Sequence, residues 1–129
     1  AVIVLVKDRK NRLLLGRQKV WAEKRFSNFA GFVELGESLE NAIRREIKEE
    51  TGLEVSEINY LSSQPWPFPA SIMMAFSAVT DEPEKAVADG NEIVELKWFS
   101  KNELLNSEIV LPDNLSISRK MINYWLDNE

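Results

Sequence analysis

The stretch "GFVELGESLENAIRREIKEETGL", residues 31 to 53, combines the signals of a capped helix with a high density of glutamates. Ser38 is typical of a helix N-cap, and Glu40 lies in the first turn, where acidic residues are favoured. Gly52 is typical of the residue that ends a helix in a left-handed conformation. The pattern predicts a helix over residues 39 to 51.

On a helical wheel of about 100° per residue, this helix has an apolar side made of Leu39, Ala42, Ile43 and Ile47. Glu46 and Glu50 fall on that same side, so the alternative reading of a solvated charged surface does not suit them. Two carboxylates spaced i, i+4 repel, and turning them inward adds a desolvation cost of several kcal/mol per unpaired charge. A divalent cation would relieve both effects, and oxygen-only ligands suit Mg²⁺ or Mn²⁺. We therefore predict a metal site that Glu49 can join, with Arg45 placed at i, i+4 to hold Glu49.

The rest of the chain predicts a mixed α/β fold in a single domain over residues 1 to 129. The elements we expect are a hairpin from Val2 to Gln18, a short strand in "FAGF", strands near residues 54–62, 72–80 and 92–99, a short helix in "SKNELL" and a closing helix over residues 116–126. The last helix carries an apolar stripe of Ile117, Met121, Ile122 and Trp125.

Composition restricts the chemistry. The chain has 129 residues, a net charge of -5 and neither cysteine nor histidine. A thiolate zinc site, a cysteine nucleophile and an imidazole base are therefore excluded within this chain. The acidic balance argues against a broad nucleic-acid footprint, so an anionic substrate would need an imported cation. Without an apolar run of membrane-spanning length or a signal peptide, we expect a cytoplasmic protein with no membrane association.

The helix and its flanks match the pattern G-x5-E-x7-R-E-U-x-E-E-x-G-U, in which U is an apolar aliphatic residue. The nine matching residues are Gly31, Glu37, Arg45, Glu46, Ile47, Glu49, Glu50, Gly52 and Leu53. The chain thus resembles the Nudix hydrolase superfamily at every position of the Nudix box. The resemblance implies the Nudix fold, an α/β/α sandwich around a mixed β-sheet with a loop-helix-loop, and hydrolysis of a nucleoside diphosphate linked to another group. It implies Mg²⁺ or Mn²⁺ on Glu46 and Glu50, with the Ala30 carbonyl facing the cation beside Gly31.

A second element follows the box, the proline-rich stretch "SQPWPFPAS" from Ser63 to Ser71. It is similar to the S-Q-P-W-P-F-P-x-S element of the NADH pyrophosphatase branch of the superfamily. A run this rich in proline neither continues a helix nor forms a central strand, and it can hold aromatic and polar groups at little entropic cost on binding. The resemblance assigns substrate binding to Gln64, Pro65, Trp66, Pro67, Phe68, Pro69, Ala70 and Ser71. The alternative is a turn in which Trp66 and Phe68 are simply packed.

Three further positions match this branch. Glu92, expected to open a strand, stands where the branch carries another acidic residue near the metals, and the alternative is a surface glutamate of an edge strand. Ser118 matches a position that contacts the dinucleotide. Phe32 could stack on a base or belong to the core. Metals at Glu46, Glu49, Glu50 and Glu92 would act on the pyrophosphate, and Glu49 and Glu92 both stay open as the general base.

The predicted reaction is hydrolysis of NADH or NAD⁺ to nicotinamide mononucleotide and AMP. Alternatives are ADP-ribose, another nucleotide sugar or the NAD cap of an RNA as substrate, or a module that senses a nucleotide without cleaving it. Members of the branch carry an N-terminal domain and a four-cysteine zinc ribbon, which this sequence does not contain, so we expect either a catalytic domain cut from a longer protein or a shorter relative. The resemblance also implies a homodimer.

Overall fold

A mixed β-sheet forms the centre of the molecule. The computed structural model describes residues 1–66 and 71–128. The strands are β1 (Val2–Asp8), β2 (Leu13–Gln18), β3 (Phe29–Gly31), β4 (Ser56–Trp66), β5 (Ser71–Thr80) and β6 (Ile93–Phe99). Their order is β4-β5-β1-β2-β6, and the short β3 pairs with the first half of β1. Only the β1–β5 pair among the described ladders is parallel, which confirms the predicted mixed sheet.

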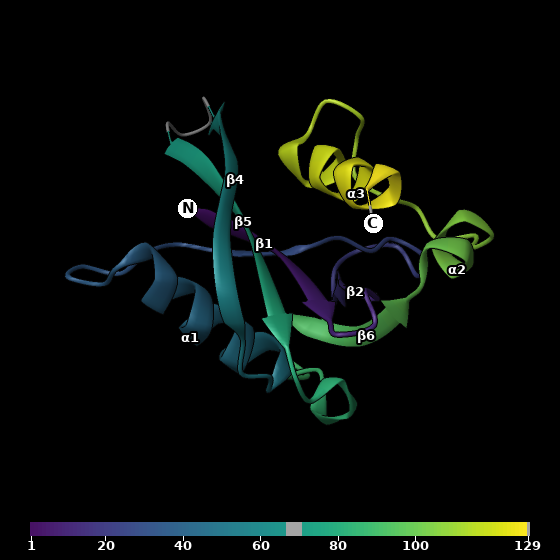
Figure 1. The fold of residues 1–129 in the computed structure, drawn as a ribbon, viewed down its shortest axis with the longest axis horizontal. Helices are drawn as coiled ribbons and strands as arrows, with labels where there is room; N and C mark the ends of the chain where they lie inside the picture. The colour runs from purple at the N-terminus through teal and green to yellow at the C-terminus, as the bar shows by residue number, and fades with distance from the viewer. Residues whose placement is uncertain (67–70, 129) are drawn as a thin grey trace.

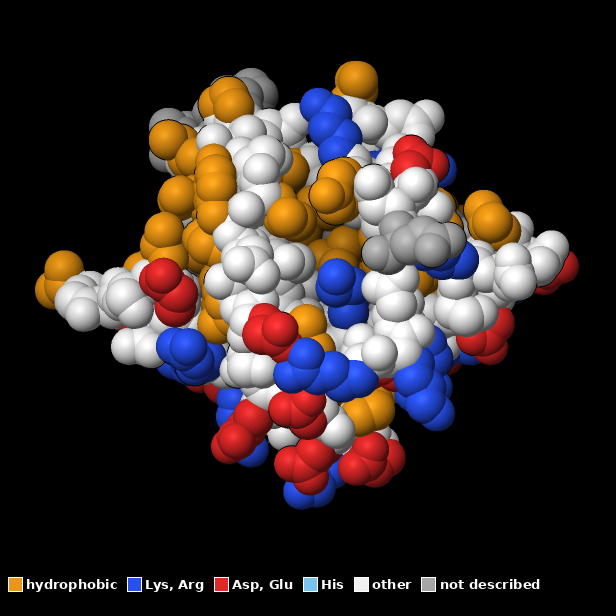
Figure 2. Space-filling view, viewed as in Figure 1, with side chains coloured by type: hydrophobic (Ala, Val, Ile, Leu, Met, Phe, Trp, Pro, Cys, Tyr) orange, Lys and Arg blue, Asp and Glu red, His pale blue; other side chains and the backbone are white. Residues whose placement is uncertain are grey.

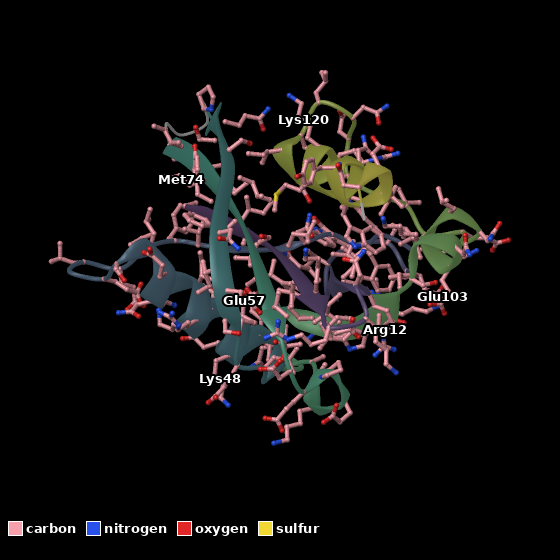
Figure 3. The ribbon with its side chains drawn as sticks, viewed as in Figure 1. Arg12, Lys48, Glu57, Met74, Glu103 and Lys120 are labelled. Atoms are coloured by element: carbon pink, nitrogen blue, oxygen red, sulfur yellow. The ribbon has the colours of Figure 1, made fainter. Side chains whose placement is uncertain are left out.

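Helices cover both faces of this sheet. They are α1 (Leu39–Thr51), α2 (Lys101–Leu105) and α3 (Ile117–Asp127), with a short 3₁₀ helix, η1 (Pro83–Lys85), before β6. Helix α1 lies on one side of the sheet and α3 on the other (Figure 1). The side chains of Lys48 on α1 and Lys120 on α3 extend away from the sheet into solvent (Figure 3). The predicted α/β/α sandwich is therefore confirmed.

The core has two halves, one on each face of the sheet, and β1 contributes to both. Val2, Val4 and Val6 join the cluster under α1. Ile3 and Leu5 join the cluster under α2 and α3, together with all four residues of the apolar stripe predicted for the last helix. Because successive residues of a strand point to opposite faces, a strand buried on both faces reads as a continuous apolar run.

Most element boundaries agree with the sequence prediction, and two differ. Strand β4 continues to Trp66, beyond the predicted end near residue 62. Pro65 fits there because β4 is an edge strand, where a missing amide breaks no ladder on the open side. Strand β6 begins at Ile93, so Glu92 lies in the turn before the strand and not at its first position.

The visible face of the molecule separates charge from apolar surface (Figure 2). Charged side chains gather at the end of the sheet where η1 lies, whereas hydrophobic side chains follow β4 and β5. Tyr60 and Ile72, which belong to those strands, are more than half exposed. Within residues 1–66 and 71–128, no helix has the length and hydropathy needed to cross a membrane.

Candidate active site

Helix α1 has the ends that the sequence predicted. The Ser38 hydroxyl accepts a hydrogen bond from the Asn41 amide, and Gly52 adopts the left-handed conformation with φ of 74°. The Gly52 amide donates to the Lys48 carbonyl at 2.9 Å. Ala42, Ile43 and Ile47 are fully buried against the sheet, which fixes the rotation of the helix about its axis. Glu46 and Glu50 are thereby directed towards β3 and the sheet.

Gly31, at the end of β3, makes room for Glu46. A Cβ atom added at Gly31 would lie 2.2 Å from the carboxyl carbon of Glu46 and 2.4 and 2.5 Å from its two oxygens. Every other residue type would therefore displace this carboxylate. The structure thus gives close approach of strand and helix as the reason for a glycine at this position.

Arg45 ties the loop before α1 to the helix. Its Nε and NH2 atoms donate to the two carboxylate oxygens of Glu37 at 2.8 and 3.0 Å. Further bonds reach the Phe32 carbonyl at 3.0 Å and Glu46 Oε1 at 2.9 Å, and Glu49 lies 3.5 Å away. Hydrogen bonding to Glu37 raises the pKa of Arg45, and the same pair lowers the pKa of Glu37. The main partner of Arg45 is thus Glu37, where the sequence suggested Glu49.

Glu50 has the only carboxyl group among the described residues with a buried oxygen that lacks a hydrogen-bond partner. Its residue is 4% exposed, and Oε2 is buried without a hydrogen-bond partner. Burial, with the charges of Glu46 and Glu92 as secondary causes, raises the pKa of Glu50 to about 8. A buried, unpartnered carboxyl is destabilising unless a ligand or cation contacts it, so such a group points to a functional role.

The other predicted carboxylates differ in their burial. Burial also raises the pKa of Glu46, opposed by its hydrogen bond to Arg45. The Glu49 side chain is 59% exposed, and Glu92 is exposed. In the described part of the chain, no three acidic side chains are gathered tightly enough to form a ready-made ligand set. The donors nevertheless fit a hard cation in kind, since all are oxygens and one is buried without a partner.

A pocket of about 330 Å³ opens beside this cluster. It brings together four of the predicted residues, Ala30, Glu50, Gln64 and Ser118, from β3, α1, β4 and α3. Apolar side chains such as Met73 and Ile93 form much of the remaining lining. A concave, largely apolar space with a few convergent polar groups is typical of a small-molecule site.

The other predicted substrate residues lie outside this lining, as far as the structure describes them. Phe32 is 72% exposed, so the alternative of a core residue is wrong. Pro65 and Ser71 lie at the facing ends of β4 and β5. Trp66 ends β4, but its side chain is outside the described residues, as are Pro67, Phe68, Pro69 and Ala70.

Sequence reasoning missed one wall of the pocket. Asn28 is buried and donates through Nδ2 to the carbonyl and hydroxyl oxygens of Ser118, at 3.2 and 3.0 Å. Ser27 Oγ lies 3.0 Å from Ser118 Oγ. Trp21 also lines the pocket. Trp21, Ser27 and Asn28 precede the box in the sequence. They follow no regular pattern that would have indicated a place in the pocket.

Comparison with known proteins agrees with this geometry. Residues 1–123 match the sequence profile of the family described as NUDIX domain. The chain belongs to this family. A hydrolase of the NUDIX family from Clostridium perfringens has the same fold, with a TM-score of 0.76, 26% identity and coverage of 98% of this chain and 94% of that chain.

Two relatives are similar in sequence and carry the same functional name. The protein "NAD-capped RNA hydrolase NudC" of Mycobacterium bovis is 44% identical over 137 residues, covering 97% of this chain and 44% of the relative. The protein "NAD-capped RNA hydrolase NUDT12" of Macaca fascicularis is 38% identical over 122 residues, covering 89% of this chain and 26% of the relative. The Nudix chain therefore spans less than half the length of these curated relatives.

Proposed function

We propose that this Nudix chain is a metal-dependent pyrophosphohydrolase that cleaves NADH or NAD⁺ to nicotinamide mononucleotide and AMP. The proposal depends mainly on the surroundings of the Glu50 carboxyl group. It is buried without a partner for Oε2, it has a pKa raised to about 8, and it lines the one described pocket that also contains Ala30, Gln64 and Ser118. Similarity to relatives named as hydrolases of NAD-capped RNA supports the choice of substrate.

The proposed cofactor is Mg²⁺ or Mn²⁺, with no zinc in this chain. Glu46, Glu49 and Glu50 on α1, the Ala30 carbonyl and Glu92 are the groups that would hold it. When bound, such a cation neutralises pyrophosphate oxygens and lowers the pKa of an attacking water molecule. This would reconcile an acidic protein with an anionic substrate.

The chain's own residues would have separate tasks. Arg45 holds Glu37 and Glu46 in place and so positions the carboxylates. Glu49 and Glu92 are both exposed, and either could accept a proton from water. Phe32, exposed beside Gly31, is suited to stacking on a base. Ser118 and residues 65–71 of the "SQPWPFPAS" element would contact the nucleotide.

The names of the relatives favour a second candidate substrate, the NAD cap at the 5′ end of an RNA. The bond cleaved would be the same pyrophosphate. ADP-ribose and other nucleotide sugars would use the same groups without a nicotinamide. A homodimer in the cytoplasm remains an expectation from the resemblance, and sedimentation of the purified chain would measure its oligomeric state.

A product assay tests the proposal. The chain would be incubated with NADH, NAD⁺, ADP-ribose and NAD-capped RNA, each with Mg²⁺ or Mn²⁺, and the products separated by chromatography. We expect AMP and the nicotinamide mononucleotide from NADH or NAD⁺ at the highest kcat/KM. Glu46→Gln and Glu50→Gln should each retain less than about a tenth of this rate, since loss of a metal ligand removes several kcal/mol of stabilisation.

The same assay can reject the proposal. Binding of NADH by calorimetry without release of AMP would instead indicate the nucleotide-sensing module. Retention of more than about a tenth of the rate in either variant would contradict the assignment of the ligands.

A further inference from the structure

Gln64 belongs to the "SQPWPFPAS" element, but its side chain contacts the start of α3. Its Nε2 atom donates to the Leu115 carbonyl at 3.0 Å, and its Oε1 atom accepts from the Ile117 amide at 3.0 Å. We infer that Gln64 is a positioning residue that fixes the first turn of α3 as a wall of the nucleotide pocket. The inference rests on the proposed function, because it assigns a role within that same site.

The geometry fits a helix cap supplied from another strand. Ile117 is the first residue of α3, and its amide is one of those that a helix leaves without an internal partner. The helix's own cap, Ser116, accepts instead from the Arg119 amide. The two partners also fix the orientation of the Gln64 amide group, because the Leu115 carbonyl can only accept and the Ile117 amide can only donate.

The turn held in this way forms part of the pocket. Ser116, Ile117 and Ser118 all line it, as do Ala30 and Glu50. Asn28, in the segment before β3, contacts the same turn through the two hydrogen bonds that it donates to Ser118.

The turn is therefore held from β4 on one side and from residue 28 on the other. Removing the two hydrogen bonds from Gln64 on β4 would change the shape of the pocket and leave the carboxylates of α1 in place. The expected consequence is weaker nucleotide binding with the chemical step largely preserved.

Four variants separate this role from direct contact with substrate. Gln64→Leu removes both bonds at similar size, whereas Gln64→Glu keeps the acceptor and loses the donor. Ile117→Pro removes the amide that Gln64 accepts from. Proline is favoured at the first helical position, and the extended Ser116, with ψ of 148°, suits a following proline. Ile117→Val is the matched control, because it trims the same side chain and keeps the amide.

We expect Gln64→Leu to raise KM for NADH by about three- to tenfold, a part of the free energy of the two neutral hydrogen bonds that it removes, with kcat within about twofold. Gln64→Glu should raise KM at least as much, because its second carboxylate oxygen would face the Leu115 carbonyl, which can only accept. The change in KM seen in Ile117→Val is first subtracted from that in Ile117→Pro, because it reports the effect of the trimmed side chain. After this correction, the double variant of Gln64→Leu with Ile117→Pro should have a KM no higher than that of the worse single variant. If Gln64 instead contacts the substrate, the two effects multiply and the inference is overturned.

Amide hydrogen exchange gives a readout that does not need turnover. In Gln64→Leu the Ile117 amide should exchange at least about tenfold faster, as expected for a lost hydrogen bond, while amides in the middle of α3 keep their protection. Unchanged exchange at Ile117 would overturn the inference. A wild-type chain that hydrolyses none of the dinucleotides would contradict the proposed function alone, since exchange at Ile117 and calorimetric binding of AMP would still decide the role of Gln64.

Discussion

Glu50→Gln should make the chain more stable when metal is chelated, and the gain should depend on pH. Glu50 is 4% exposed with an unpartnered Oε2, and its pKa is raised from 4.5 to about 8. The folded state therefore keeps the proton between pH 4.5 and about 8, whereas the unfolded chain releases it. Because the folded state binds more protons in this range, its stability falls as pH rises and levels off above about 8.

The magnitude follows from the span of pH. From pH 4.5 to pH 7 there are about 2.5 pH units, and each unit lowers the free energy of unfolding by about 1.4 kcal/mol. At pH 7 the wild-type chain has therefore lost about 3 kcal/mol of stability through Glu50. A glutamine at position 50 has similar size and no charge, and it avoids this loss. The expected difference in Tm between Glu50→Gln and wild type is about 2 to 3 °C at pH 5 and roughly 10 °C at pH 7.

Thermal unfolding in EDTA, followed by circular dichroism from pH 5 to pH 9, measures this difference. Glu49→Gln is the matched control, because it removes a charge one residue away from a side chain that is 59% exposed. The control should change little with pH. The reasoning is refuted if Glu50→Gln is destabilising throughout the range, or if its difference from wild type does not grow between pH 5 and pH 7.

Two further substitutions test the framework around the carboxylates. Gly31→Ala should lower the activity by on the order of 100-fold, because the new Cβ would displace the Glu46 carboxylate. A variant with an intact far-ultraviolet circular dichroism spectrum and wild-type activity would contradict this prediction. Arg45→Lys should also lower Tm and lower kcat by about tenfold or more, since a lysine cannot form the bidentate contact with Glu37. Unchanged kinetics would show that this contact is dispensable.

Much of the fold could be predicted because its signals are local. The caps of α1, its apolar face and the continuous apolar run of β1 are each encoded within a few neighbouring residues. The Nudix box adds a fixed spacing within 23 residues, from Gly31 to Leu53. Local patterns therefore placed Glu46 and Glu50 on the buried side of α1 correctly.

The parts that could not be predicted depend on contacts between distant segments. Asn28 and Ser118 are 90 positions apart, and Gln64 lies 53 positions from Ile117. No periodicity in a single sequence reports such pairs. The resemblance indicated substrate contact for Gln64, but only the three-dimensional structure, in which its side chain reaches the start of α3, reveals its bonds to that backbone.

In the proposed function, glutamates of α1 hold a divalent cation. Titration of the chain with Mn²⁺, followed by electron paramagnetic resonance of the free ion, measures this directly in wild type, Glu46→Gln, Glu50→Gln and the exposed control Glu40→Gln. We expect a saturable site that weakens by at least about tenfold, or 1.4 kcal/mol, in the first two variants and is retained in the control. Equal Mn²⁺ affinity in all four proteins would contradict it.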